Sequence, residues 1–296
     1  MHPGLELKKE MANGGPLQPF LGVFDCFSAS VAAPYSQNLF VSGFGMAASF
    51  YGLPDVGYIA WSDMVQSAWR IRQILPNHRL LVDIDDGYVD SNTACHVVRQ
   101  LDRMGVAMAM LEDQARPRRC GHADGKLILA LDAYIGKLNA VLDAREDMLV
   151  LARTDASGDD IFRRVDAISA TSADALMVDG ISSLEMLEQV RDRTDKPFLF
   201  NQMCGGKSPR LTFAQLRNAG INMVQYSTPL LFAAQTAMAA ALDDLFLSDG
   251  LLPDPATTKC IGVKECTSPS PPTCRQRAGT VLTSRSAARG TRGKHW

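Results

Sequence analysis

Eight short apolar segments, separated by stretches with helical spacing, constrain the fold of this chain more than any other feature. The segments are 21–24, 39–42, 80–85, 107–112, 148–153, 175–179, 198–201 and 222–226. Short apolar runs bounded by polar turns are typical of buried strands. After the fourth segment, Leu131, Ile135, Leu138 and Leu142 recur at helical spacing. Alternating strands and helices predict a parallel sheet, and eight repeats predict closure into an α/β fold of the (β/α)8 TIM barrel type.

An open, doubly wound α/β sheet is the alternative architecture. Such a sheet usually has a glycine-rich phosphate-binding turn after its first strand, and Val23-Phe24-Asp25-Cys26 is not one. A chain of 296 residues with 46% hydrophobic content suffices for one barrel. We therefore expect an N-terminal extension (1–18), a catalytic barrel (19–250) and a disordered basic tail (251–296), since the tail is rich in proline and arginine.

The charge and the two ends of the chain bear on its partners and location. A formal net charge of -2 provides no basic field for a nucleic acid, so we expect no nucleic-acid partner. The charged N-terminus lacks the apolar stretch of a secretory signal, and no uninterrupted apolar run reaches the length of a membrane span. We expect a cytoplasmic protein without a membrane partner. Its seven cysteines lack the paired short spacings of a zinc site or a disulfide scaffold.

Polar residues follow most of the apolar segments, at the strand ends where a barrel places its active site. Asp83, Asp85 and Glu112 end adjacent segments, and such carboxylates suit a hard cation such as Mg²⁺. Because side chains alternate along a strand, Asp83-Ile84-Asp85 predicts two acids that point the same way. The alternative is that these residues are solvated loop acids or helix caps.

Arg153 ends the apolar run 148–152, so its guanidinium is expected to emerge into the barrel mouth. A planar fork of N–H donors suits a carboxylate or phosphonate ligand. The alternative is a buried ion pair with Asp155 or Asp179.

Residues 112–126, here called the lid segment, are polar and glycine-bearing and lie between a predicted strand and helix. Such a segment is typical of a loop that closes over a substrate. Arg118, Arg119 and His122 flank Cys120 in the sequence, which predicts a lowered thiol pKa and a proton donor or acceptor near neutral pH. The alternative is a solvated basic loop with an incidental thiol.

Short motifs occur in a fixed order along the chain. They are Phe24-Asp25, Ser42-Gly43-Phe44-Gly45, Gly52-Leu53-Pro54-Asp55, Asp83-Ile84-Asp85-Asp86-Gly87-Tyr88, Leu111-Glu112-Asp113-Gln114, Arg118-Arg119-Cys120-Gly121-His122, Ala152-Arg153-Thr154-Asp155-Ala156 and Gly205-Gly206-Lys207-Ser208-Pro209. In this order the set resembles the isocitrate lyase and phosphoenolpyruvate mutase superfamily, over about residues 20 to 247.

The resemblance implies a set of functional residues. Mg²⁺ would be held around Asp83, Asp85 and Glu112. The implied catalytic residues are Cys120, which delivers a proton to an enolate product in the lyase branch, Asp55, which lies over the reacting centre, and Arg153, which holds an anionic group. The substrate-binding residues would be Ser42, Gly43, Phe44, Gly121, His122, Asp179 and Asn201.

Three departures from the lyase pattern bear on the reaction. Asp179 and Cys204 each stand where lyases usually have Glu, and Tyr226-Ser227-Thr228-Pro229 replaces a compact Tyr-Pro turn. These positions would hold the far carboxylates of a lyase substrate. The departures favour the phosphonomutase branch, in which a transferase converts carboxyphosphonoenolpyruvate to phosphinopyruvate with loss of CO2 in phosphinate antibiotic biosynthesis.

The alternative function is a carbon–carbon lyase acting on 2-methylisocitrate or a substituted malate. Both reactions pass through an enolate, and both predict a small 2-oxo acid or phosphonate as the substrate. A third reading is a catalytically inactive barrel that serves as a binding protein, which the intact acids, Cys120 and Arg153 oppose. Association into a homo-oligomer through the sides of the barrel stays open.

Overall fold

The computed structural model describes residues 1–12 and 14–254. Residues 13 and 255–296 lie outside the described residues, and so does most of the tail expected at 251–296. Contacts divide the chain into two compact units, Met1–Phe232 and a second that begins at Ala233. The first unit contains every strand among the described residues and every residue of the candidate site.

Eight parallel strands form one sheet in the order β6-β5-β4-β3-β2-β1-β8-β7. They are β1 (Gln18–Val23), β2 (Asn38–Val41), β3 (Arg79–Asp83), β4 (Met108–Glu112), β5 (Leu149–Thr154), β6 (Ala175–Val178), β7 (Leu199–Asn201) and β8 (Met223–Tyr226). A parallel bridge between Leu176 and Phe198 links β6 to β7, so the sheet nearly closes on itself. Every predicted segment overlaps one strand, and the (β/α)8 barrel is confirmed.

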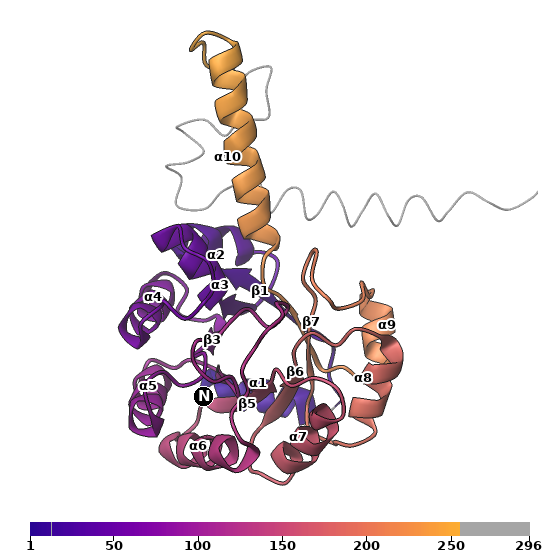
Figure 1. Ribbon diagram of the computed structural model, residues 1–296. Helices are drawn as coiled ribbons and strands as arrows, with labels where there is room; N and C mark the ends of the chain where they lie inside the picture. The colour runs from indigo at the N-terminus through magenta and orange to yellow at the C-terminus, as the bar shows by residue number, and fades with distance from the viewer. Residues whose placement is uncertain (13, 255–296) are drawn as a thin grey trace, which may run out of the picture. The chain divides into compact units, whose positions relative to one another are not determined.

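Helices between the strands surround the barrel, as Figure 1 shows. They are α2 (Cys26–Ala32), α3 (Gly43–Met46), the π-helix η1 (Ala47–Tyr51), α4 (Trp61–Ile74), α5 (Ser91–Arg103), α6 (Leu131–Ala144), α7 (Asp160–Ser169), α8 (Leu184–Arg191) and α9 (Phe213–Asn218). Several begin at side-chain caps. Asp25, at the end of the first predicted strand, accepts a hydrogen bond from the Ser28 backbone N–H at 2.6 Å and caps α2.

Alternation of side chains along the strands divides the core into two layers. One layer, which includes Leu39, Val82 and Val150, packs between the strands and the helices. The other fills the barrel and includes Phe40, Leu81, Met110 and Leu151.

Helix α1 (Pro3–Ala12) contributes Leu7 and Met11 to the layer inside the barrel. At the same end, the Arg79 guanidinium at the start of β3 pairs with Glu10. The first twelve residues thus close the barrel at the strand N-termini. A stretch predicted only as an extension is therefore part of the core packing.

The inward-facing positions change from apolar to polar at the strand C-termini. In each case the polar residue lies two positions after an apolar residue of the barrel interior. The pairs are Phe40 and Ser42, Leu81 and Asp83, Met110 and Glu112, Leu151 and Arg153, Met177 and Asp179, Leu199 and Asn201, and Met223 and Gln225. The two-residue period of a strand therefore sets a ring of polar side chains above an apolar plug.

Helix α10 (Pro229–Leu247) follows β8 and is rich in alanine and leucine. By length and composition, it is the one helix of the described chain that could cross a membrane. A single helix of this kind supports a membrane location only weakly, because core helices of water-soluble proteins pass the same test.

Candidate active site

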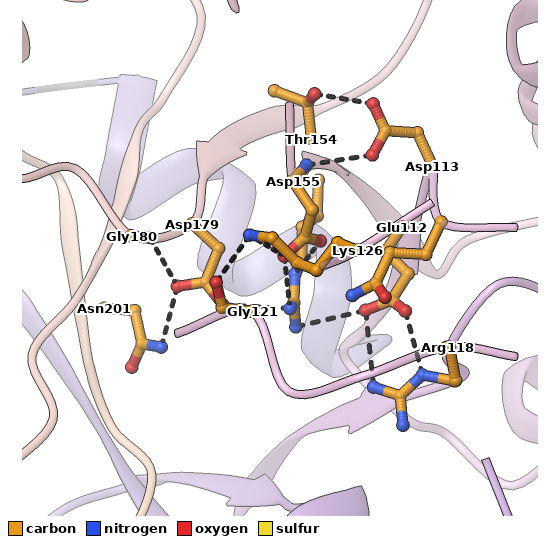
Figure 2. Close-up of polar contacts among 12 residues, drawn as sticks. Glu112, Asp113, Arg118, Gly121, Lys126, Thr154, Asp155, Asp179, Gly180 and Asn201 are labelled. Carbon is orange, nitrogen blue, oxygen red and sulfur yellow. Dashed lines mark hydrogen bonds and ion pairs between the residues drawn. The ribbon is translucent and has the colours of Figure 1, made fainter. Parts of the chain in front are cut away.

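Arg118 of the lid segment points into the barrel mouth, with only 2% of its surface exposed. Its Nε donates a hydrogen bond to Glu112 Oε1 at 2.9 Å, as Figure 2 shows. Its NH1 pairs with Asp55 Oδ1 and lies 3.3 Å from Asp85 Oδ1. One guanidinium therefore joins three acidic residues, and the lid segment is closed over the strand ends.

Arg153 forms a second centre of ion pairs. Its Nε and NH2 donate to the two carboxylate oxygens of Asp155 at 2.8 and 2.9 Å. NH2 lies 2.9 Å from Asp179 Oδ2, and NH1 lies 3.3 Å from Glu112 Oε2. Both of the buried pairings considered for Arg153 thus occur, and the residue also lines the cavity of the site.

Positive charge is scarce in the barrel mouth. The arginine and lysine side chains in the described ion pairs there are Arg118, Arg153 and Lys126. The carboxylates that pair with them or line the cavity are more numerous: Asp55, Asp83, Asp85, Glu112, Asp155 and Asp179. Burial raises the pKa of Asp85 to about 7 and that of Glu112 to about 8, despite the opposing charge of Arg118. Within the described chain, Asp85 Oδ1 accepts no hydrogen bond. A bound cation would offset this deficit.

The carboxylates suit a cation that keeps some of its water. No group of three or more His, Cys, Asp or Glu side chains in residues 1–12 and 14–254 is arranged to hold a metal ion by itself. Mg²⁺ usually takes one or two protein carboxylates and retains several waters, so it does not need a closed set of protein ligands. Buried, charge-deficient acids therefore fit Mg²⁺ better than Zn²⁺, which needs three or four protein ligands.

Asp83 and Asp85 both lie in the site but differ in backbone conformation. Asp83 ends β3, whereas Asp85 follows the strand with a φ of 51° and donates its N–H to Asp83 Oδ1 at 3.1 Å. The prediction that both lie on one strand is therefore wrong. Both are nevertheless buried, so they are not solvated loop acids. A Cβ at Gly43 would lie 3.3 Å from each carboxylate, so this glycine lets the loop after β2 approach them closely.

Ser42, which caps α3, and Gly43 and Phe44, which begin that helix, follow β2 beside these acids. The Ser42 Oγ accepts a hydrogen bond from the Gly45 N–H at 3.0 Å and fixes the start of α3. The Phe44 ring packs edge-on against Phe232, with the ring centroids 6.2 Å apart. Ser42 and Phe44 line the cavity, and their role in substrate binding stays a prediction.

Cys120 lines the same cavity, but its electrostatic setting differs from the prediction. Burial first, and then the charges of Asp179 and Asp55, raise the pKa of the thiol to about 11. The predicted lowering is wrong because Arg118 turns toward the acids and Arg119 is exposed, donating to the Asp124 carbonyl at 3.4 Å. A thiol with this pKa is protonated at neutral pH and suits a proton donor.

Gly121 and His122 pack the lid segment against Asp179. A Cβ at Gly121 would lie 1.9 Å from Asp179 Oδ2 and 2.5 Å from the Arg153 NH2, so only glycine fits. His122 Nδ1 accepts a hydrogen bond from the Lys207 N–H at 2.9 Å, so its Nε2 carries the proton that faces Asp179 Oδ1 at 3.2 Å.

Asp113 supports the site without having been predicted to do so. Its Oδ1 accepts from the Asp155 N–H at 2.8 Å, and its Oδ2 lies 3.1 Å from the Arg164 NH1 (Figure 2 shows the Asp113 contacts with Thr154 and Asp155). Asp155 in turn orients Arg153. The sequence signal was present, since Asp113 belongs to one of the quoted motifs.

The closed site contains little free space. The remaining cavity measures about 20 Å³, which is room for about one water molecule. Its walls also include Met203, Gln225 and Ser227, which were not predicted as site residues. Gln225 continues the inward alternation from Met223 along β8, and that pattern could have found it. A substrate with several carboxylates needs the lid segment to move before it can enter.

The sequence matches the family described as phosphoenolpyruvate phosphomutase over residues 7–246. It is 30% identical over 256 residues to a 2-methylisocitrate lyase of Shewanella oneidensis, covering 83% of this chain and 86% of the relative. It is also 30% identical over 224 residues to a 2,3-dimethylmalate lyase of Eubacterium barkeri, covering 73% of this chain and 77% of the relative.

A solved structure of 2,3-dimethylmalate lyase, described as a member of the PEP mutase/isocitrate lyase superfamily, has the same fold. It superposes with a TM-score of 0.85 at 28% identity, covering 100% of this chain and 99% of the other. These findings agree with the order of motifs in the sequence.

We predict that Gly121→Ala opens the lid segment, because the added methyl group would overlap Asp179 and Arg153. Hydrogen exchange of the lid amides should accelerate by about tenfold or more, which corresponds to about 1.4 kcal/mol less protection. Gly136→Ala is the control, since a Cβ at Gly136 on α6 meets no atom within 4 Å. Equal lid exchange in the two variants would contradict the close packing at Gly121.

Proposed function

The chain belongs to the phosphoenolpyruvate phosphomutase family, within the PEP mutase/isocitrate lyase superfamily, and from this premise we propose that it is a Mg²⁺-dependent carbon–carbon lyase. The proposed substrate is a substituted malate or 2-methylisocitrate, in agreement with the two lyases to which the chain is 30% identical. The observation that carries the proposal is Cys120, a protonated thiol that lines the same cavity as Asp55, Asp83 and Asp179.

Asp83, Asp85 and Glu112 are the residues proposed to hold Mg²⁺. Their support is the deficit of positive charge and the raised pKa values of Asp85 and Glu112. When bound, Mg²⁺ would polarise the 2-hydroxyl oxygen of the substrate and stabilise the negative charge that develops there as its proton leaves.

The protein residues would perform the remaining steps of the cleavage. The substrate hydroxyl gives its proton to a carboxylate, for which Asp55 is our candidate because it lines the cavity. The hydroxyl-bearing carbon becomes a carbonyl as its bond to C3 breaks, and the electron pair moves into the adjacent carboxylate as an enolate. Cys120 then gives its thiol proton to C3, and proton exchange with water restores both residues.

The other predicted residues would bind and enclose the substrate. Arg153 and the backbone of Ser42, Gly43 and Phe44 would face its anionic groups, while Gly121 and His122 would hold the lid segment closed. Closure excludes water from the enolate, which strengthens electrostatic interactions in the site.

A phosphonomutase reaction is the second candidate. Asp179, Cys204 and the residues after Tyr226 differ from the lyase pattern at positions that would hold the far carboxylates of a lyase substrate. The proposed Mg²⁺ site and the closed lid segment would serve this reaction equally well. The lyase takes first place because the two curated relatives described above are lyases.

Two assays on one preparation separate the candidates. With Mg²⁺ and 2-methylisocitrate or 2,3-dimethylmalate, a lyase releases pyruvate. With Mg²⁺ and carboxyphosphonoenolpyruvate, a mutase produces a new carbon-bonded phosphorus signal in ³¹P NMR. We expect pyruvate. A new phosphorus signal without pyruvate would select the mutase, and the absence of both products would favour an inactive barrel.

We predict that Mg²⁺ binds more weakly as the pH falls through about 8 and 7, because the carboxyls of Glu112 and Asp85 must lose their protons to act as ligands. Calorimetric titration should give an affinity about tenfold or more lower near pH 6 than near pH 9. Asp85→Asn should abolish most of the binding at both pH values. Asp166→Asn, which alters an exposed acid on α7, is the control. A pH-independent affinity would remove these carboxyls from the ligand set.

We also predict that Cys120→Ser reduces kcat by about 100-fold to 10,000-fold with little change in the affinity for oxalate, since the thiol serves the chemical step. Cys95→Ser on α5 is the matched control and should retain kcat. In a mutase that needs no proton at carbon, the loss would appear mainly in binding. An unchanged kcat in Cys120→Ser would exclude the thiol from catalysis.

A further inference from the structure

A directed chain of hydrogen bonds runs from Asp179 to the end of β8. Burial alone raises the pKa of Asp179, but the charge of Arg153 and hydrogen bonds from His122 and Asn201 lower it overall, so this residue is an anion that can only accept. Asn201 Nδ2 donates to Asp179 Oδ1 at 3.0 Å. This contact leaves the Asn201 Oδ1 to face β8 as an acceptor.

The next two links follow from that orientation. The Ser227 hydroxyl donates to Asn201 Oδ1 at 3.0 Å, which uses the only proton of the hydroxyl. Gln225 Nε2 donates to the Ser227 Oγ at 2.8 Å. The charge of Asp179 thus fixes which way the Gln225 amide points, because a reversed amide would place its carbonyl oxygen against an oxygen with no proton left to give.

Gln225 Oε1 is the last atom of this series of hydrogen bonds and, among the described residues, an acceptor without a donor. The residue is only 2% exposed and lines the cavity, and its Oε1 has no hydrogen-bond partner in the part of the chain that the structure describes. A buried amide oxygen without a donor costs about 1–3 kcal/mol, so a ligand that brings a donor gains that amount.

The position of Gln225 determines which part of a ligand it meets. In the strand order of the barrel, β8 lies three strands from β3 and four from β4, across the mouth from Asp83, Asp85 and Glu112. A substrate whose hydroxy-acid end is held at those carboxylates therefore presents its C3 substituent to β7 and β8.

The chemistry of this wall disfavours a carboxylate. It ends in the Gln225 Oε1, an acceptor that repels a negative group, and the Arg153 guanidinium beside it is already paired with Asp179. Phe40, Phe44 and Met203 line the same cavity, which makes a charged substituent costly to bury. An uncharged group with one proton to donate matches both the acceptor and the apolar lining.

We propose that Gln225 is a specificity-determining residue that accepts a hydrogen bond from a hydroxyl group on the C3 substituent of the substrate. The inference rests on the proposed lyase function and narrows its substrate to a malate with an uncharged, hydroxyl-bearing side chain, in place of the third carboxylate of 2-methylisocitrate. Ser227 and Asn201 are positioning residues in this scheme, since they act through the orientation of the Gln225 amide.

Three 2-methylmalates that differ only at C3 provide the test. They carry a hydroxymethyl group, a methyl group (2,3-dimethylmalate) or a carboxymethyl group (2-methylisocitrate), and each would release pyruvate on cleavage. We expect kcat/KM for the hydroxymethyl compound to exceed that of each of the others by about tenfold or more, as one satisfied buried acceptor allows. Equal values, or a preference for the carboxymethyl compound, would overturn the inference.

Variants assign the preference to this residue. Gln225→Met keeps the side-chain length and removes the amide carbonyl and NH2, so the ratio of kcat/KM between the hydroxymethyl and methyl compounds should fall to about one. If Gln225 had a purely structural role, the variant would lower kcat/KM for all three substrates by the same factor. The ratio would then stay unchanged, which would contradict the proposal. Should Gln225→Met fail to fold, Ser227→Ala removes the orienting contact and should lower the ratio severalfold; an unchanged ratio would again contradict it.

Calorimetric binding of the same three compounds in the presence of Mg²⁺ separates this inference from the proposed reaction. Tighter binding of the hydroxymethyl compound, lost in Gln225→Met, would support the role of Gln225 even if no compound released pyruvate. Pyruvate release from all three compounds without a Gln225-dependent preference would retain the lyase and refute the specificity role.

Discussion

The buried guanidinium of Arg118 is the interaction on which the rest of the site depends. It joins Glu112 at the end of β4, Asp85 after β3 and Asp55 in the segment that precedes α4. These acids come from three separate parts of the chain and would repel one another without it. Even with Arg118 in place, burial first, and then the charges of neighbouring carboxylates, keep the pKa values of Asp85 and Glu112 raised. The buried carboxylates hold Arg118 of the lid segment in place. Because they outnumber the cations around them, they also favour binding of a divalent cation.

A simple repeat positions the other groups. Midway along the strands the inward-facing residues are apolar, and two residues further toward the C-terminal end a polar residue follows on seven of them. The apolar plug is closed at the opposite end by Leu7 and Met11 of α1, so the polar ring rests on a packed support. The ring has two poles: acids for a proposed metal near β3 and β4, and neutral amides and a hydroxyl near β7 and β8. This division underlies both the proposed cleavage and the proposed selection of the C3 substituent.

The strands and most of the polar ring could be predicted from the sequence because both follow from local periodicity. What could not be predicted depends on backbone turns and on contacts between distant residues. Asp85 leaves the strand geometry through a left-handed conformation that the alternation does not encode. Arg118 and Cys120 are close in sequence, yet the guanidinium turns toward Asp55 and Glu112, and burial raises the pKa of the thiol to about 11. Gln225 is paired in register with Asn201 and obeys the same alternation, so the sequence pattern could have predicted its place in the ring.

The central claim is that a divalent cation and an enolate-like ligand complete a site that the closed lid segment encloses. Limited trypsin digestion tests it directly, since Arg119 and Lys126 of the lid segment are cleavage sites in an open loop. With Mg²⁺ and oxalate together, cleavage in the lid segment should slow by about tenfold or more relative to either alone. Equal cleavage rates under all three conditions would contradict the account.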